Sequence, residues 1–473
     1  MIPLVDFPEL VQHYAPSFER VFSPAAFVQF KRYISGLIVS ENKTVEGINR
    51  VFVVESRNQS SLNRLLTESP FSVTDLNQAR LDLLNALPAT RLKPPQGVLS
   101  VDDTLLTHYG KHFDEIAKLY DPKDDRYVWA HNLVTLHYSD DDTDYPVFFQ
   151  LWKPVDLDHL EQGLVAAGIP LRESKQPLKT AAPDKWKAYV LGVWRRHSHR
   201  PEVAALYDSK LRIAEHLLAH WVQAHPELHA HVPVTFDNWY TQPGFCHYIG
   251  DRLGLAYVGS LAEHDVVLLR TGAERLDRFA ARLKAEHLRA RAEKRPGVFQ
   301  RITIHYKGAR ESYYSYCATH RMQSFGKVRL VINYRQEDLH DDPVFIIANR
   351  LHWQALGITR IRRHRWPVEV YHEEGKDEGL DQYQLQDFEA IGRHVALVAT
   401  VYSLLRAAQH DPDLRHRLHR ELKLELEGSA PFWGRVTQAQ SLWALALFIS
   451  AGLAQGQPLR QVMTPLLRAV CAA

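Results

Sequence analysis

The spacing at which hydrophobic residues recur changes several times along this chain. The order of those changes constrains the fold more than any other feature of the sequence. Residues 1–90 repeat apolar side chains at the spacing of an α-helix. That pattern stops at Leu92–Gly97, which contains two adjacent prolines. A short apolar strand is predicted next, at Val98–Asp102. The chain therefore passes from an all-helical region into a region with strands.

Strands and helices both recur after this point. Further strands are predicted at 129–138, 147–152, 232–236, 301–307, 311–321, 327–335 and 344–348. Helices are predicted over 155–225 and 273–292, and from about 353 to the end of the chain. The acids between the second and third strands, Asp140–Asp144, are predicted to form a solvated hairpin turn. This order indicates an α/β protein with helical regions at both ends.

Composition excludes several other classes of protein. Hydrophobic residues are 45% of the 473 residues and charged residues 24%, which excludes disorder as the main state. The three cysteines include no CxxC pair, so we expect no disulfide framework, and a reducing cytoplasm is the expected location. The longest apolar runs, Val395–Leu405 and Leu442–Ala454, are shorter than the ~20 residues that cross a bilayer, so no membrane partner is predicted.

Three acidic residues are the candidates for chemistry. Asp102 and Asp237 each follow an apolar strand, although aspartate at a strand end is also common in ordinary turns. Glu369 lies in a basic segment, and on a helical wheel it falls within about 40° of Arg365 and Lys376. Arg362 joins that stripe if the whole segment is one helix. The alternative is a solvated face stabilised by ion pairs.

The three carboxylates suit a site with two metal ions. Mg²⁺ prefers oxygen ligands, and two ions ~3.5–4 Å apart can clamp the attacking and leaving oxygens of a phosphoryl transfer. Asp103 and Glu373 adjoin two of the acids, so the choice of ligand stays open between neighbours. Pro367 is predicted to kink the helix that carries Glu369 or to mark its irregular start.

Taken together, these motifs resemble those of the bacterial insertion-sequence transposases of the DDE class. Arg365, Glu369 and Lys376 match the last three positions of the signature Tyr-x2-Arg-x3-Glu-x6-Lys, which is typical of the insertion sequence four superfamily. The tyrosine position holds Arg362 instead. Ser100–Thr104 and Thr235–Asn238 match the segments that contain the first and second aspartates.

This resemblance implies a fold, a reaction and a set of roles. The implied fold is an RNase H-like catalytic core interrupted by a β-rich insertion. The implied boundaries are 1–92 for a helical DNA-binding domain, 93–254 and 351–410 for the core, 255–350 for the insertion and 411–473 for a helical C-terminal region. Asp102, Asp237 and Glu369 are the implied catalytic and metal-binding residues, while Arg362, Arg365 and Lys376 are the implied contacts to DNA.

The implied activity is cut-and-paste excision and integration of an insertion sequence. Two Mg²⁺ ions, which Mn²⁺ can replace, are the implied cofactors. Double-stranded DNA at the element's ends and at the target is the implied substrate, bound by a homodimer. A bacterial cytoplasm, in association with the nucleoid, is the implied location.

Two other functions are compatible with parts of the sequence. A DNA-binding protein derived from a transposase, inert in catalysis, would use the same basic segments without the acids. A hydrolase acting on sugars would use a carboxylate pair but has no evident use for the cations that flank Glu369. The basic segments at 275–301 and 350–365 either line a groove for phosphates or are two exposed basic faces.

Overall fold

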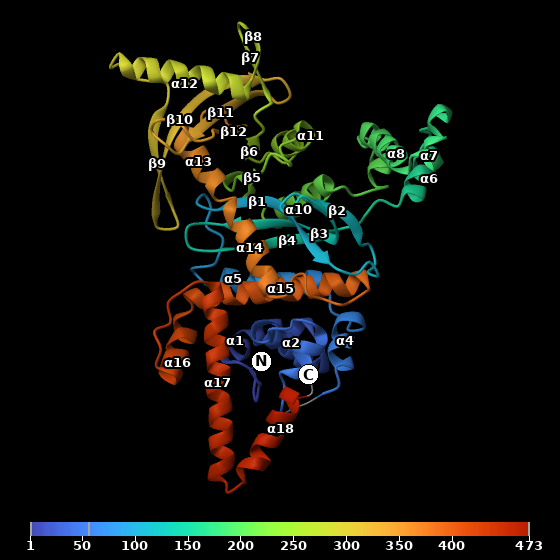
Figure 1. Cartoon of the computed structure of the whole chain (residues 1–473), viewed down its shortest axis with the longest axis vertical. Coiled ribbons are helices and arrows are strands. Elements are labelled where there is room, and N and C mark those ends of the chain that lie inside the picture. The colour runs from blue at the N-terminus through green and yellow to red at the C-terminus, as the bar shows by residue number, and fades with distance from the viewer. Residues whose placement is uncertain (1, 55–56, 472–473) are drawn as a thin grey trace.

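A single mixed sheet occupies the middle of the molecule in the computed structural model, which describes residues 2–54 and 57–471 (Figure 1). The sheet has twelve strands in the order β2-β3-β1-β5-β6-β12-β11-β10-β7-β8, with β4 beside β3 and β9 beside β10. The strands are β1 (Val98–His108), β2 (Ala117–Asp121), β3 (Arg126–Ser139), β4 (Asp144–Trp152), β5 (Val234–Phe236), β6 (Tyr257–Leu261), β7 (Val266–Leu269), β8 (Gly272–Arg275), β9 (Gln300–Tyr306), β10 (Ala309–Met322), β11 (Gly326–Tyr334) and β12 (Val344–Ala348).

Helices cover both ends of the chain and link the parts of the sheet, as the sequence predicts. They are α1 (Glu9–Tyr14), η1 (Ala15–Val21), α2 (Pro24–Val39), α3 (Val45–Arg50), α4 (Ser60–Thr67), α5 (Val73–Ala86), α6 (Leu157–Ala166), η2 (Glu173–Lys175), α7 (Leu178–Ala181), α8 (Pro183–His197), α9 (Pro201–Ala204), α10 (Lys210–Ala224), η3 (His229–His231), α11 (Pro243–His247), η4 (Tyr248–Arg252), α12 (Leu276–Ala292), α13 (Ala355–Arg363), α14 (Trp366–Asp377), α15 (Phe388–His410), α16 (Pro412–Leu422), α17 (Ala430–Ala454) and α18 (Leu459–Cys471).

Local capping explains where two N-terminal helices begin. The hydroxyl of Thr44 accepts a hydrogen bond from the amide of Gly47 at the start of α3. The hydroxyl of Ser72 accepts hydrogen bonds from Thr74 and Asp75 at the start of α5. Each bond satisfies an amide that has no partner within the helix. These capping bonds fix the starts of α3 and α5.

Strand β1 lies at the centre of the sheet and is longer than the sequence predicts. It pairs antiparallel with β3 from Val98 to His108, whereas its parallel pairing with β5 ends at Val101. The prediction of a strand that ends at Asp102 is therefore wrong. Strand β3 is long and continues to form hydrogen bonds with β1 beyond Asp102. The hydrophobic pattern of β1 alone does not show that such a partner is present.

The β-rich segment predicted after residue 300 is present, and it continues the central sheet. Strand β12 pairs antiparallel with β6, and β6 pairs in parallel with β5. The hairpin between β9 and β10 turns at Lys307 and Gly308, both of which have positive φ angles. The predicted basic helix at 273–292 begins later, at Leu276, because residues 272–275 form β8. The boundary of the predicted insertion therefore falls within one continuous sheet.

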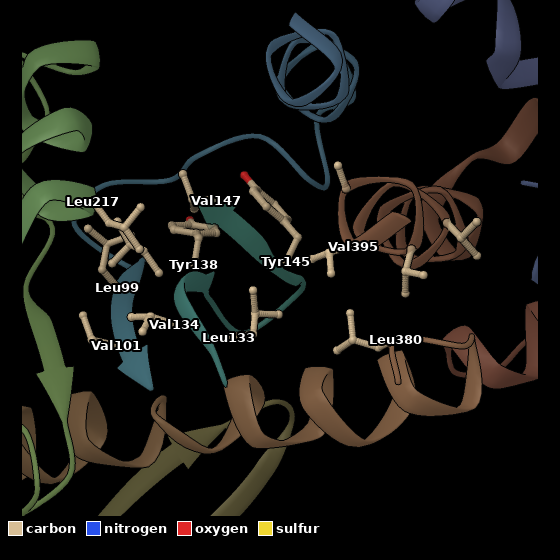
Figure 2. Close-up of a cluster of buried hydrophobic side chains, with 14 of the residues drawn as sticks. Leu99, Val101, Leu133, Val134, Tyr138, Tyr145, Val147, Leu217, Leu380 and Val395 are labelled. Atoms are coloured by element: carbon tan, nitrogen blue, oxygen red, sulfur yellow. The ribbon is translucent and has the colours of Figure 1, made fainter. Parts of the chain in front are cut away.

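Helix α15 lies between the sheet and the N-terminal helices (Figure 1). Figure 2 shows its residue Val395 beside the buried side chains of β1, β3 and β4, with Leu217 of α10 on the other side of the cluster. A helix that is apolar on nearly every face belongs in the interior of a protein. The main core therefore joins α15 and the N-terminal helices to the sheet that carries the first two candidate acids.

Among the residues that the structure describes, two helices are long and apolar enough to cross a membrane by length and composition. They are α15, with 78% of its most apolar window buried, and α17, with 22% buried. The apolar runs in the sequence are shorter than these helices, because polar residues at either end also adopt helical conformation. Burial marks α15 as a core helix, whereas α17 leaves much of its apolar surface exposed.

The helices α6, α8 and α9 form a smaller unit at one side of the sheet (Figure 1). Leu160, Trp186, Trp194 and Val203 belong to its own buried cluster, separate from the main core. This unit adjoins α10 and the loop that leads into it.

Candidate active site

Asp102 and Asp237 follow equivalent positions of two neighbouring parallel strands. Val101 of β1 is paired with Phe236 of β5, so each aspartate is the next residue along its strand. Adjacent parallel strands present residues of the same register side by side. The two carboxylates therefore lie close together, and the negative charge of Asp237 contributes to raising the pKa of Asp102.

Asp102 occupies a poorly solvated position. Burial, as the largest effect, raises its pKa to about 7, and the charges of Asp237 and Asp103 act in the same direction. The guanidinium of Arg365 opposes this shift. A carboxylate that is costly to charge without a nearby cation is a common feature of functional sites. The environment therefore favours a bound cation beside Asp102.

Asp237 orients the turn that follows β5. Its Oδ1 atom accepts hydrogen bonds from the amides of Trp239, at 3.0 Å, and Tyr240, at 3.1 Å. Among the described residues, no hydrogen bond ends on Oδ2. The turn therefore holds the carboxylate in place and leaves one oxygen for another ligand.

Glu369 lies in the first turn of α14, which is separate from α13. The break comes at His364, and Arg365 occupies the N-cap of α14. Pro367 lies in the first turn, where a missing amide donor costs nothing. The sequence placed Arg362 on the same stripe as Glu369 only if the whole segment is one helix, and it is not. Arg365, Glu369 and Lys376 belong to α14 or its cap, whereas Arg362 belongs to α13.

Arg365 links the first and third candidate acids. Its Nη1 atom lies 3.1 Å from Oδ2 of Asp102, and its Nη2 atom donates to Oε1 of Glu369. The arginine side chain is only 11% exposed. One cationic group thus contacts carboxylates from β1 and α14, close to Asp237. The sequence predicted contacts from Arg365 to phosphate, and in this structure its guanidinium contacts these acids.

Asp103 has a different role from Asp102, which the sequence alone did not separate. Three donors contact its carboxylate: Asn132 at 2.6 Å, Lys210 at 2.8 Å and the hydroxyl of Tyr240 at 2.9 Å. These bonds tie β1 to β3, to α10 and to the turn after β5. Such a fully bonded carboxylate is less available to a metal than Asp102 is.

The other predicted DNA contacts occupy different surroundings. Arg362 donates from Nε to Oγ of Ser260, at 2.6 Å, and burial as the largest effect lowers its pKa to about 10. The charges of Asp237 and Glu369 also act on it, so it lies near the acids. Lys376 is half-buried near the other end of α14. Arg362 is therefore part of the acid cluster, whereas Lys376 stands apart from it.

A buried ionic network behind the site was missed in the sequence. Asp144 is 1% exposed and accepts hydrogen bonds from Lys307 at 2.6 Å and from the hydroxyl of Tyr402 at 2.7 Å. Arg406 lies 3.3 Å both from Asp144 and from Glu374 of α14. The prediction that residues 140–144 are a solvated turn is therefore wrong for Asp140 and Asp144, which are each 1% exposed. The tip of the β9–β10 hairpin and α15 cover Asp144.

The donor chemistry of the acids fits a hard divalent cation. Asp102 and Glu369 already share one cationic group, and all three side chains offer carboxylate oxygens, which Mg²⁺ prefers. Within the described residues, no three His, Cys, Asp or Glu side chains are grouped closely enough to hold a metal as they stand. The predicted assignment of Asp102, Asp237 and Glu369 as metal ligands stays a prediction.

Comparison with known proteins identifies the family. No curated protein matches the chain. The family model described as DDE superfamily endonuclease matches residues 17–301, which is more than half of the chain and includes Asp102 and Asp237. That match ends before Glu369, so it supports the family without assigning the third acid. The site and the match together place this chain in the DDE superfamily endonuclease family, whose members act on DNA.

Proposed function

We propose that this protein is a DNA transposase that excises and integrates an insertion sequence by cut-and-paste phosphoryl transfer. The observation that carries the proposal is the bridge from Arg365 to both Asp102 and Glu369, beside Asp237. Asp102 and Glu369 come from segments far apart in the chain and contact the same guanidinium, and the charge of Asp237 acts on Asp102. The family of endonucleases to which the chain belongs supports this assignment.

Asp102, Asp237 and Glu369 would hold two Mg²⁺ ions, with Mn²⁺ able to replace them. When bound, these ions supply charge stabilisation for the attacking and leaving oxygens of a phosphodiester. The bonds from Trp239 and Tyr240 to Asp237 fix the direction of one carboxylate. Asp103 keeps β1 in place through its bonds to Asn132 and Lys210.

Arg365 is proposed to change partners during the reaction. Its guanidinium contacts Asp102 and Glu369 in this structure. Divalent ions held by these acids would neutralise them in its place, and Arg365 would then be able to donate two parallel hydrogen bonds to a phosphate. Arg362 and Lys376 are the other proposed contacts to DNA phosphates, as the resemblance implies.

The proposal includes an RNase H-like core, interrupted by the β-rich insertion. What supports it is the set of strands β3, β1, β5 and β6, which changes from antiparallel to parallel pairing at β1. The two aspartates lie at the point where β1 and β5 meet. The proposed location is the bacterial cytoplasm, in association with the nucleoid.

A strand-cleavage assay tests the proposed reaction. Labelled DNA from the sequence on either side of the gene is incubated with the protein in Mg²⁺, Mn²⁺ or EDTA. Cleavage at the element's end in Mg²⁺, absent in EDTA, is expected of the wild type. Asp102→Asn, Asp237→Asn and Glu369→Gln should abolish cleavage while DNA is still bound.

The matched control for this assay is Asp377→Asn, since Asp377 is an exposed carboxylate at the far end of the helix that carries Glu369. Its cleavage rate should equal that of the wild type. Cleavage retained by any of the three acid variants would remove that residue from the site. Tight binding to the element's ends with no cleavage by the wild type in either metal would favour the inert DNA-binding alternative.

The proposal also includes a homodimer, which holds two element ends together. The exposed half of α17 supports a second copy of this chain as its partner. Leu442 and Leu447 are 56% and 51% exposed, and the chain carries no charged residue from Val436 to Leu459. Two such surfaces meet without like-charge repulsion, and the pair α17–α18 can close into a four-helix bundle about a two-fold axis.

A further inference from the structure

A cavity of about 710 Å³ lies where the N-terminal helices, the sheet and the smaller helical unit meet. Its walls are the start of α5, the end of β4, the loop between α9 and α10, and the first turns of α15 (Figure 1). Asp102, Asp237 and Glu369 are not among the residues that line it. Cavities of about 300–1,000 Å³ at such junctions commonly bind ligands. The proposed reaction assigns this cavity no role.

Strand β4 presents an open edge to the cavity. In the described part of the chain β4 pairs with β3 alone, so its other edge has no strand beside it. Side chains of α5 cover that edge at Val147, whose carbonyl accepts hydrogen bonds from Asn77 at 3.0 Å and from Arg80 at 3.2 Å. From Phe149 onward the strand lines the cavity instead. An edge of this kind has backbone groups that can pair with an added strand.

Apolar side chains surround this edge. Those along the cavity include Phe71, Phe149, Leu151, Leu206, Phe388 and Val395. Such walls favour a ligand that carries apolar groups of its own. Successive side chains of an extended peptide point to opposite sides, so every second residue of an added strand would face these walls.

Gly392 keeps space open on the wall that α15 forms. In the described structure, a methyl group in place of its hydrogen would lie more than 4 Å from every atom outside its own stretch of helix. Glycine inside a helix is less stable than alanine. Packing against the neighbouring elements gives no reason for glycine here, whereas a ligand that occupies the space does.

Carboxylates outnumber cations around the cavity. The carboxylates are Glu115, Asp156, Asp208 and Glu389, and the cations are Lys153 and Arg393. Both cations lie over aromatic rings, Lys153 at 4.6 Å from the centre of Phe388 and Arg393 at 5.1 Å from the centre of Phe71. Glu115 and Glu389 are exposed, and neither forms an ion pair within the described residues. The cavity therefore attracts a cationic ligand and repels the phosphates of DNA.

We propose that this cavity binds an extended, basic and apolar segment of a partner protein, which adds a strand to the edge of β4. The backbone of that segment would pair with β4 beyond Phe149, and its apolar side chains would enter the space beside Gly392. Its lysine or arginine side chains would face Glu115 and Glu389. The site goes beyond the proposed cleavage of DNA and is independent of it, so neither result decides the other.

Fluorescence polarisation with a short labelled peptide tests the site in the full-length protein. The probe is a capped peptide that alternates valine and lysine. One companion peptide has glutamate in place of lysine, and another is N-methylated on its backbone amides. The wild type should bind the lysine peptide and bind each companion roughly ten-fold more weakly. Failure to bind the lysine peptide would overturn the proposal, and equal binding of the N-methylated peptide would exclude strand addition.

Gly392→Leu tests the place of binding, because leucine fills the cavity from a position where it meets no other wall. It should weaken binding of the lysine peptide roughly ten-fold. The matched control is Gly357→Leu, since Gly357 is a helical glycine on α13 with equally open surroundings, outside the cavity. Its affinity should equal that of the wild type, and thermal denaturation checks that both variants are folded. Unchanged affinity in Gly392→Leu, or an equal loss in both variants, would contradict binding in this cavity.

Glu389→Lys tests the charge of the ligand. It should weaken binding of the lysine peptide and strengthen binding of the glutamate peptide, by roughly five-fold each. The control is Glu286→Lys, as Glu286 is an exposed glutamate on α12, outside the cavity. Equal effects in the two variants would show that the peptides respond only to net charge, and the proposed contact would be wrong.

Discussion

Arg365 forms ion pairs with two of the three candidate acids in this structure. Its guanidinium contacts Asp102 and Glu369, and no other cation is placed between these two acids in the described part of the chain. Burial makes the charged form of Asp102 costly. The arginine therefore has a structural effect that is separate from any contact with DNA, and the two effects can be measured apart.

We expect Arg365→Ala to destabilise the metal-free protein by about 1–3 kcal/mol, because it leaves a buried carboxylate without its cation. Added Mg²⁺ should recover part of that loss if the acids then bind the ion. Chemical denaturation with and without Mg²⁺ measures both effects. Equal stability of the variant and the wild type in EDTA would show that the bridge contributes nothing.

The imidazole of His137 gives a second prediction at this scale. Burial, as the largest effect, lowers its pKa to about 3, opposed by Asp144 and assisted by His372, Lys307 and Arg406. Folding therefore favours the neutral ring. The contribution of the neutral His137 ring to the free energy of unfolding is fully present above pH 6.5, the ordinary pKa of histidine. This contribution is lost as the pH falls towards 3, because the unfolded chain then binds a proton that the folded protein does not.

The variant His137→Gln should thus lose less stability than the wild type between about pH 6.5 and pH 3. When the free energy of unfolding is plotted against pH, the slopes of the wild type and the variant should differ by up to about 1.4 kcal/mol per pH unit, the value for one proton. Urea denaturation at several pH values measures it. Parallel stability profiles for the two proteins would contradict a buried, neutral His137.

At the scale of secondary-structure elements, the β9–β10 hairpin helps to position α14. Lys307 at its tip reaches the buried Asp144 of β4, which also contacts Arg406 of α15. Arg406 in turn holds Glu374 on α14, the helix that carries Glu369. The insertion therefore contributes to the geometry of the candidate site from a distance.

Lys307→Met should destabilise the fold by about 1–3 kcal/mol, because it removes a cation from a carboxylate that is 1% exposed. We also expect slower cleavage of DNA at constant affinity, since α14 would be less well positioned. Lys327→Met is the matched control, as Lys327 is exposed on β11 of the same insertion. A similar loss of stability in both variants would rule out a specific role for the hairpin tip.

For the whole molecule, the unusual feature is the apolar surface of α17. Its first half packs against α15 and α2, while its second half extends past the N-terminal helices and α18 turns back (Figure 1). Contiguous exposed apolar surface on a protein commonly marks an interaction site. A second copy of the chain is the partner that we propose for it.

The double variant Leu442→Glu, Leu447→Glu should shift the protein from dimer to monomer, because it places charges in the proposed contact. Sedimentation velocity in the absence of detergent measures the change. The control is Leu288→Glu, as Leu288 is a similarly exposed leucine on α12, with 43% exposure. A wild type that is monomeric at all concentrations, or that binds vesicles through α17, would refute the second-copy proposal.

The sequence by itself determined the features that depend on neighbours along the chain. Hydrophobic periods predicted the helices and most strands. The capping bonds of Thr44 and Ser72 are equally local, because each bond spans only a few residues. Asp102 and Asp237 were candidates because each follows a short apolar run, a pattern that is also local in the sequence. The roles of the candidate site residues as metal ligands and DNA contacts remain predictions.

Only the tertiary structure decided which distant side chains meet. Arg365 reaches Asp102 across 263 residues of sequence, and Lys307 reaches Asp144 across 163. Neither pairing leaves a local pattern, because its geometry depends on the packing of the whole sheet against α14 and α15. For the same reason, the sequence could not show that Asp103 is fully bonded while its neighbour Asp102 lies beside two other acids and a single arginine.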